Sequence, residues 1–147
     1  MLEIVDVHPD RLPYFPTVSG SRIPLKFILD LFDAKFQPKD VVEVFPDVGI
    51  DVLSLIYDNI TFFRKCLRAL KVVSVRRDIL NGIPVIRGTR IPVHMIYDML
   101  DSGYTPYEIL EEYPELSLGL VRHLIRYRGI LEPIVRRIRR RILAEEG

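Results

Sequence analysis

The sequence repeats itself at a spacing of 68 residues, and the two copies align without a gap. Eleven identities fall between residues 16 and 46, and most intervening positions exchange similar residues, such as Phe36 for Tyr104. This agreement indicates one fold present twice, so positions that agree are expected to serve structure and positions that differ to serve function. The identical residues, each recurring 68 positions later, are Pro16, Gly20, Arg22, Ile23, Pro24, Ile28, Asp30, Asp33, Pro38, Glu43 and Pro46.

The second copy predicts a β-hairpin followed by a helix. Residues 73–75 and 84–86 are short β-rich runs on either side of an Asn81-Gly82 turn signal. Pro92 suits a first helical turn, and the apolar spacing after it predicts a helix that ends at the Ser102-Gly103 pair.

Two further helices are expected in a helix-turn-helix arrangement. Thr105 and Glu108 have the spacing of a capping box around Pro106, so a short helix begins there. Pro114 ends that helix, and Ser117 is placed to cap a third helix that runs to about residue 127. The first copy follows the same pattern.

These elements predict a mostly α protein with short β-hairpins, an α+β fold in which two tandem helix-turn-helix repeats form a pseudo-dimer. The expected units are residues 1–68, 69–131 and 132–147. Gly129 is expected to end the third helix, and Pro133 to open a separate C-terminal helix. A monomer with internal pseudo-twofold symmetry and a homodimer both fit this pattern.

Positive charge is concentrated in the second copy. Residues 1–68 carry eight Lys and Arg against ten Asp and Glu, whereas residues 69–147 carry thirteen against ten. From Arg122 to Arg141 there are eight arginines against Glu132 alone, a local charge of +7. Such a concentration is typical of a surface that binds a polyanion.

The third helix of the second copy is the first candidate nucleic-acid-binding element. Arg122, His123 and Arg126 are expected on its exposed face, with Arg128 close behind, where a helix-turn-helix contacts bases and phosphates. The first copy has acidic residues, Asp51 and Asp58, at two positions of this face, so only the second copy is expected to bind. The alternative is a solvated charged face with no ligand.

The C-terminal helix is the second candidate. Its isoleucines form a narrow apolar stripe, which leaves three alternatives: nucleic acid, the groove of a partner protein, or an anionic membrane, the last disfavoured because the stripe lacks an aromatic anchor. Replacing its five arginines by Gln is expected to abolish most polyanion binding with little change in thermal stability. The candidate residues are Arg136, Arg137, Arg139, Arg140 and Arg141.

The residues shared by both copies are expected to be structural. Arg22 and Arg90 are predicted to pair with the nearby carboxylates, Asp30 in one copy and Asp98 in the other, rather than to build a metal site. Gly20 and Gly88 are expected to serve backbone geometry.

No catalytic pattern is present. The three histidines lack metal-ligand spacing, and the sequence has no Ser/His/Asp order, zinc motif or dinucleotide fingerprint. We therefore expect no enzymatic activity, no cofactor and no metal. The lone Cys66 is expected to be a packed apolar side chain. The chain shows neither a signal-peptide pattern nor a membrane-spanning run, which predicts a cytoplasmic protein without a membrane partner.

The run Pro84-Val85-Ile86-Arg87-Gly88-Thr89-Arg90-Ile91-Pro92, followed by Gly103-Tyr104-Thr105-Pro106 and Tyr113-Pro114-Glu115-Leu116, resembles the signature of a VapB-like antitoxin family. The resemblance covers residues 73–127 well and residues 5–59 weakly. It implies a β-hairpin with three helices, and as partners a small nuclease toxin of the PIN-like type and promoter DNA. Members of this family are typically single units, whereas this chain carries two unequal copies.

The sequence thus predicts a non-enzymatic, antitoxin-like regulator that binds DNA, a small nuclease toxin, or both. One alternative is an RNA-binding factor that associates with the ribosome or with structured RNA, because two unequal repeats do not match a palindromic operator. A second alternative is an adaptor that binds only protein.

Overall fold

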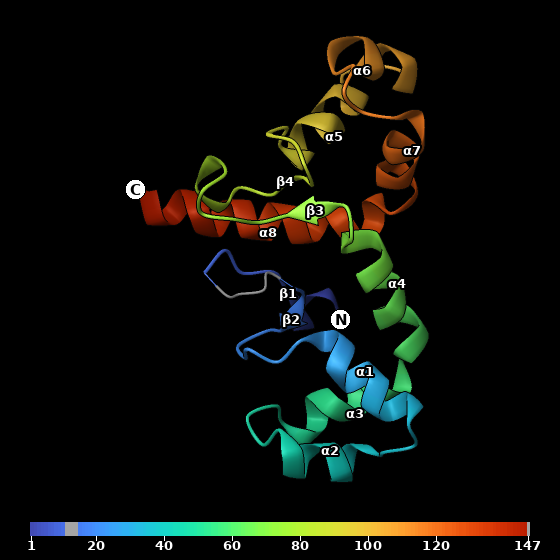
Figure 1. The fold of residues 1–147 in the computed structure, drawn as a ribbon, viewed down its shortest axis with the longest axis vertical. Coiled ribbons are helices and arrows are strands. Elements are labelled where there is room, and N and C mark those ends of the chain that lie inside the picture. Colours follow the sequence, from blue (N-terminus) through green and yellow to red (C-terminus); the bar gives the residue numbers. More distant parts are fainter. Residues whose placement is uncertain (11–14, 147) are drawn as a thin grey trace.

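The computed structural model describes residues 1–10 and 15–146, which form eight α-helices and two small antiparallel strand pairs (Figure 1). The fold is therefore mostly helical with short β-hairpins, as predicted. In the first half the elements are a 3₁₀ turn η1 (Leu2–Ile4), β1 (Val5–Asp6), β2 (Thr17–Val18), α1 (Leu25–Asp33), α2 (Pro38–Val44), α3 (Ile50–Asp58) and α4 (Ile60–Leu70).

Elements of the second half begin and end 68 residues after their counterparts. The two strand pairs have the same register, with Val5 opposite Val18 and Val73 opposite Ile86. The second-half elements are β3 (Val73–Ser74), a 3₁₀ turn η2 (Leu80–Gly82), β4 (Val85–Ile86), α5 (Val93–Asp101), α6 (Pro106–Glu112), α7 (Leu118–Arg126) and α8 (Arg128–Glu146).

A tight turn after β2 and β4 aims the chain into the first helix of each half. The hydroxyl of Thr89 donates to the Ile86 carbonyl at 2.8 Å and accepts from the Ile91 amide at 3.0 Å. Ser21 makes the same pair of bonds in the first half. Gly20 and Gly88 have φ of 79° and 82°, a left-handed conformation that glycine adopts without steric cost.

The predicted start of the short helix α6 is confirmed. The Thr105 side chain accepts from the Glu108 amide at 3.2 Å, and the Glu108 carboxylate accepts from the Thr105 amide at 3.1 Å. The helix before it ends as predicted, with Ser102 as its C-cap and Gly103 at a φ of 94°. These local signals determine the helix boundaries because they satisfy backbone groups that the helix leaves unpaired.

The prediction of a separate helix from Pro133 is wrong. α7 ends at Arg126, α8 begins at Arg128, and Pro133 lies inside α8. The Tyr127 carbonyl accepts from the amides of Ile130 and Leu131, which closes the first turn of α8. Because Pro133 follows that turn closely, it removes only one helical hydrogen bond near the end of the helix. The first part of α8 thus occupies residues 128–138, 68 positions after α4.

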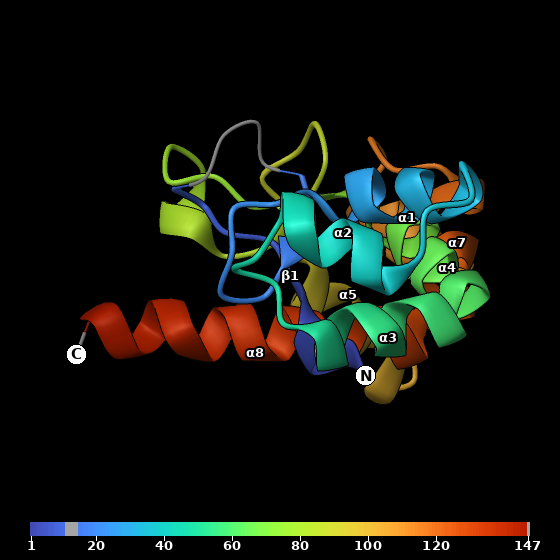
Figure 2. The same ribbon diagram turned by 90° about the horizontal axis from the view of Figure 1, so that it is seen from below.

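α8 crosses the middle of the molecule, with α1–α3 toward one end of the long axis and α5–α7 toward the other (Figure 1). Viewed at 90°, α8 lies along one side of the molecule (Figure 2). It packs against α4, α5 and α7, and α4 packs in turn against α1. Buried side chains of both halves, such as Phe63 and Leu131, form one continuous hydrophobic cluster.

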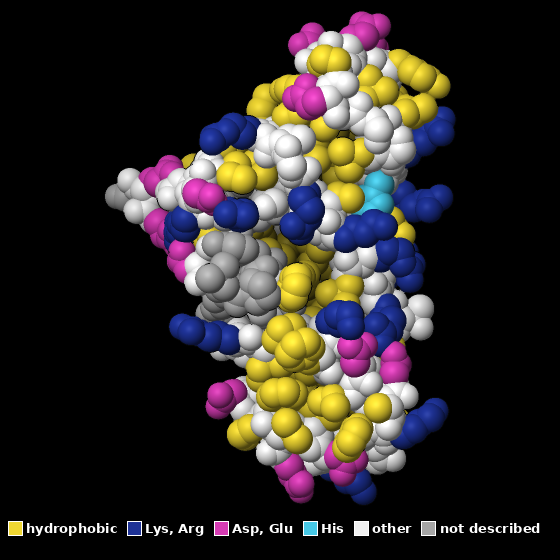
Figure 3. All heavy atoms as spheres, in the orientation of Figure 1, with side chains coloured by type: hydrophobic (Ala, Val, Ile, Leu, Met, Phe, Trp, Pro, Cys, Tyr) yellow, Lys and Arg dark blue, Asp and Glu magenta, His cyan; other side chains and the backbone are white. Residues whose placement is uncertain are grey.

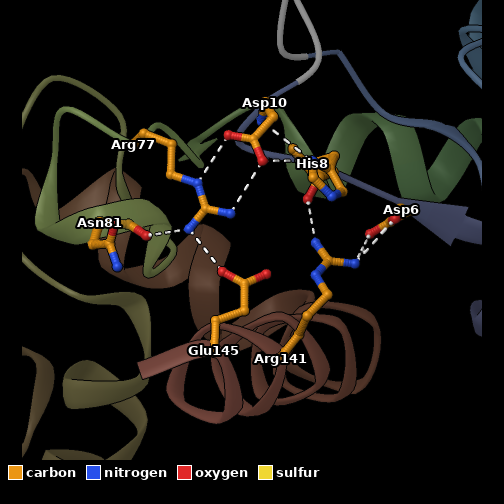
Figure 4. Close-up of polar contacts among 8 residues, drawn as sticks. Asp6, His8, Asp10, Arg77, Asn81, Arg141 and Glu145 are labelled. Atoms are coloured by element: carbon orange, nitrogen blue, oxygen red, sulfur yellow. Dashed lines mark hydrogen bonds and ion pairs between the residues drawn. The ribbon is translucent and has the colours of Figure 1, made fainter. Parts of the chain in front are cut away.

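Ion pairs hold the C-terminal part of α8 against the N-terminal segment (Figure 4). Arg141 contacts the buried carboxylate of Asp6 at 3.2 Å and donates to the Val7 carbonyl at 3.2 Å. Arg77 grips Asp10 with two nitrogens, at 2.8 and 3.1 Å, and also contacts Glu145 at 2.9 Å. We call the contacts of Arg141 and Arg77 the terminal clamp.

Among the described residues, no helix is both long enough and apolar enough to cross a membrane.

Candidate nucleic-acid interface

α7 presents two arginines on its exposed face. Ser117 caps the helix by accepting from the Leu120 amide at 3.1 Å, as predicted. Val121 and Leu124 are fully buried, so their side of α7 faces the core. Arg122 and Arg126 are exposed and lie one helical turn apart, so both are free to reach a ligand along the same helix face.

His123 anchors α7 to the carboxyl end of α4. Its Nε2 lies 3.1 Å from the carbonyl oxygen of Ala69. A carbonyl oxygen only accepts, so Nε2 carries the hydrogen. The ring is half-buried and packs on Tyr127 with a centroid distance of 4.7 Å. His123, predicted to contact nucleic acid, therefore has a positioning role within the chain.

Arg68 is a basic residue of this surface that the sequence analysis missed. Its side chain and that of Arg126 both hydrogen-bond to the Tyr127 phenol, and these bonds lower the pKa of Tyr127. Arg68 belongs to the last turn of α4, 54 positions before Arg122 in the sequence. No motif links the two helices, so only the folded chain brings Arg68 and Arg126 to the same hydroxyl.

Lys and Arg side chains gather around the single visible histidine where α4 and α7 meet (Figure 3). We call Arg68, Arg122 and Arg126 the α4–α7 basic surface. A shallow hollow lined by Gly119, Arg122, His123 and Arg126 lies within it. Guanidinium groups with several free N–H donors, placed around a hollow, are suited to contact phosphate oxygens.

The equivalent face of α3 carries the opposite charge. Its residues Asp51 and Asp58 are exposed and stand 68 positions before Gly119 and Arg126. Ser54 takes the place of Arg122. Carboxylates at these positions repel phosphate, so α3 is unsuited to the contacts that α7 can make.

The arginines of α8 divide into engaged and available groups. Arg137 donates to the carbonyls of Leu2 and Val5, and Arg141 belongs to the terminal clamp. Arg136 pairs with Glu132 at 2.8 Å. The contacts of Arg137 and Arg141 remove the basis for expecting unchanged thermal stability on loss of all five arginines. Arg139 and Arg140 are exposed and have no hydrogen bond or ion pair among the described residues.

Arg128, predicted to bind nucleic acid, is held within the chain instead. It donates to both carboxylate oxygens of Asp101 at 2.8 Å, pairs with Glu132, and lies 5.0 Å from the centre of the Tyr97 ring. These three contacts fix the start of α8 to α5.

The prediction that Arg22 and Arg90 pair with the shared carboxylates is wrong. Lys26 and Arg64 contact Asp30 instead, at 2.6 and 3.4 Å, and Arg64 also contacts Asp33. Within residues 1–10 and 15–146, Arg22 and Arg90 form no ion pair. Both follow the glycine turn and are exposed, so their side chains point away from the helix that carries the carboxylates.

Asp98 lies in a small hollow with His94 and Arg139 on the other side of the second half. Burial lowers the pKa of His94, and Arg139 lowers it further. No group of three or more His, Cys, Asp or Glu side chains within the described part of the chain is arranged to hold a metal ion. Cys66 is fully buried, and burial raises the pKa of its thiol to about 11, as fits a packed apolar side chain.

Comparison with known proteins places the similarity in the second half. Residues 73–127 match the model of a family described as a protein of unknown function, DUF433. Over 54 residues the chain is 37% identical to the uncharacterized protein y4eO of Sinorhizobium fredii, a match that covers 37% of this chain and 24% of that protein. The chain thus spans about a quarter of that relative's length. No solved structure is significantly similar to the chain.

The segment that matches the family model contains α7 with Arg122 and Arg126. Arg68 and nearly all of α8 lie outside it. The α4–α7 basic surface therefore combines residues of the matched segment with a residue that precedes it.

Proposed function

We propose that this chain is a non-enzymatic, nucleic-acid-binding regulator that contacts its target through the α4–α7 basic surface. The observation that carries this proposal is the convergence of Arg68, Arg122 and Arg126 on one exposed face. The contact between His123 and Ala69 holds the two helices together at this face. A rigidly placed cluster of guanidinium groups is what phosphate binding requires.

The order of elements favours contact through α7. α6 and α7 are joined by five residues and pack against each other, and α7 is the second helix of the pair. In DNA-binding proteins of the helix-turn-helix class, the second helix enters the major groove. Arg122 and Arg126 lie on the exposed side of that helix, so they would contact base edges or phosphates.

The experiment is a salt titration of binding, measured by fluorescence anisotropy with a labelled DNA duplex and a labelled RNA hairpin. The Arg122→Gln/Arg126→Gln variant should weaken binding and flatten the plot of log affinity against log salt by about 2. Lys35→Gln/Lys39→Gln removes the same charge from exposed positions of the first half and should leave the slope unchanged. Equal effects of the two variants would contradict the proposal.

An antitoxin-like role, with a small PIN-like nuclease as protein partner, is the form of this function that the sequence resemblance favours. Arg139 and Arg140 are exposed and lack partners among the described residues, so they are available to hold either nucleic acid or such a partner. Affinity purification from native lysate, followed by mass spectrometry, tests this: a small nuclease recovered with DNase-sensitive nucleic acid is expected. Ribosomal proteins released by RNase would contradict it.

An RNA target is the second candidate, and the charge difference between α3 and α7 favours it. A palindromic operator rewards two matched recognition helices. Here only α7 is basic, whereas Asp51 and Asp58 make α3 acidic. The anisotropy experiment separates the two: tighter binding of the hairpin than of the duplex at equal salt supports RNA.

We further propose that the two halves arose by tandem duplication of one unit and form a pseudo-dimer. The common offset of 68 residues in helix bounds, strand register and turn hydrogen bonds supports this. Sedimentation equilibrium would test whether the chain is a monomer, as an internally paired molecule should be.

A further inference from the structure

An apolar hollow opens between the two halves, next to the α4–α7 basic surface. It lies between the first turns of α1, the segment before β2 and the end of α4, and its volume is about 300 Å³. Phe15 and Phe27 line it, yet they remain 55% and 54% exposed. We call it the Phe15/Phe27 hollow.

The charged residues that line the hollow are all cationic: Lys26, Lys71 and Arg87. Arg87 is fixed in place because its Nε donates to the Lys71 carbonyl at 2.9 Å and its Nη2 to the Val73 carbonyl at 2.8 Å. Lys26 is partly neutralised by Asp30. Two unopposed cations beside two exposed rings favour an occupant that is flat or apolar in its body and negatively charged beside it.

The hollow and the basic surface share the carboxyl end of α4. Leu70 and Lys71 line the hollow, and Arg68, less than a turn earlier, belongs to the basic surface. Ala69, between them, holds His123 of α7. A polyanion bound along Arg122, Arg126 and Arg68 would therefore continue directly to the rim of the hollow.

From these contacts we infer that the Phe15/Phe27 hollow binds an unpaired nucleobase of the nucleic acid held by the α4–α7 basic surface. This inference rests on the proposed function and specifies its target as nucleic acid with a single-stranded segment. Bases stacked on aromatic side chains, with phosphates on neighbouring cations, are the general means by which proteins hold single strands. A volume near the lower end for small-ligand sites suits one planar group rather than a partner helix.

A duplex cannot fill this hollow, because its bases are stacked and paired inside the helix. An extension or bulge beside the duplex can. The structure therefore assigns two parts to the interface: α7 and Arg68 for the phosphate backbone, and the Phe15/Phe27 hollow for one unstacked base.

The test compares a blunt DNA duplex with the same duplex carrying a short single-stranded extension, by fluorescence anisotropy on the full chain. The chain should bind the extended duplex roughly 5- to 100-fold more tightly, the range expected for one stacked base. Phe27→Ala should remove this ratio and leave blunt-duplex affinity unchanged. Phe36→Ala is the matched control, since Phe36 is 47% exposed and lies past the other end of α1, and it should keep the ratio.

Equal affinity for the two duplexes, or a ratio that survives Phe27→Ala, would overturn the inference. Binding of a labelled peptide of Glu and Phe that depends on Phe27, without any gain from the extension, would overturn it too and make the hollow a site for acidic peptides. Failure of the proposed function shows differently, as blunt-duplex binding that is insensitive to Arg122→Gln/Arg126→Gln.

Discussion

The two halves of the molecule share a backbone and differ in surface charge. α3 and α7 begin and end at equivalent positions and bury equivalent side chains, such as Ile56 and Leu124. Their exposed faces carry Asp58 in one helix and Arg126 in the other. Packing and helix caps thus hold the shared fold, while exposed positions remain free to change. The difference indicates that the second half carries the polyanion-binding function and the first half supports it.

α4 and α8 differ in a second way. Both follow the third helix of their half, and residues 60–70 of α4 correspond to residues 128–138 of α8. α4 stops there and the chain enters β3, whereas α8 continues to Glu146 and joins the terminal clamp. The added turns are thus used to attach the two halves to each other.

Loss of the terminal clamp should have the largest effect. Arg141→Gln would leave the Asp6 carboxylate, which is 7% exposed, without its counter-charge, so the free energy of unfolding should fall by roughly 3 kcal/mol. Arg140→Gln, the adjacent exposed arginine, should change it by less than about 0.5 kcal/mol. Urea denaturation measures both. Similar values for the two variants would show that the clamp does not distinguish α8 from α4.

The charge difference between α3 and α7 can be erased. Ser54→Arg/Asp58→Arg would give α3 the basic face of α7, and binding of a DNA duplex should tighten, with the salt dependence of log affinity steeper by about 2. Ser54→Gln/Asp58→Gln is the control for lost carboxylate alone and should give a smaller change. If the arginine variant binds no better than this control, phosphate contact depends on more than the charge of the third helix.

The glycine turns should respond alike in the two halves. At Gly20 and Gly88 an added Cβ meets nothing within 4 Å, so the cost of alanine comes only from the positive φ. Each substitution to Ala should lower the free energy of unfolding by about 1 kcal/mol. Gly129→Ala, inside α8 and also in open space, should instead raise it by up to about 1 kcal/mol. Unequal losses at Gly20 and Gly88 would show that the halves differ in rigidity.

The smallest effect concerns two equivalent carboxylates. Arg77, from the other half, lowers the pKa of Asp10, whereas the neighbouring Arg76 lowers that of Asp78. A lowered pKa in the folded state stabilises the protein above about pH 4 and the contribution is lost as the pH falls through the lowered value. Arg77→Gln should return the pKa of Asp10 toward its usual value and leave Asp78 unchanged, as measured by NMR titration of the carboxyl carbons. A shift at both residues would show that the pairs are coupled.

Local signals in the sequence predicted much of the fold. The caps at Thr105 and Ser117 and the turn at Gly88 each involve bonds within three residues, so the residue types alone specify them. The start of α8 was mispredicted because a proline inside a helix is disfavoured in isolation. Its position is set instead by tertiary contacts such as Arg128 with Asp101, which the sequence does not show.

The candidate site was predicted in part. The periodicity of α7 correctly placed Arg122 and Arg126 on an exposed face. Charge counting does not distinguish an available arginine from an engaged one, so Arg137 and Arg141 were taken for phosphate ligands although they bind the N-terminal segment. Arg68 was missed because its contact with Tyr127 joins two helices that are far apart in the sequence.

The terminal clamp has a consequence for the order in which the chain assembles during synthesis. Arg137 and Leu2 are joined by a hydrogen bond across 135 sequence positions, so the first strand pair to be made gains this support only when nearly the whole chain has been translated. Contacts of such long separation slow folding, because a large loop must close before they form. The first half is therefore exposed to chaperones and proteases for longer than the second, and a nascent chain stopped before α8 would leave its N-terminal hairpin uncovered.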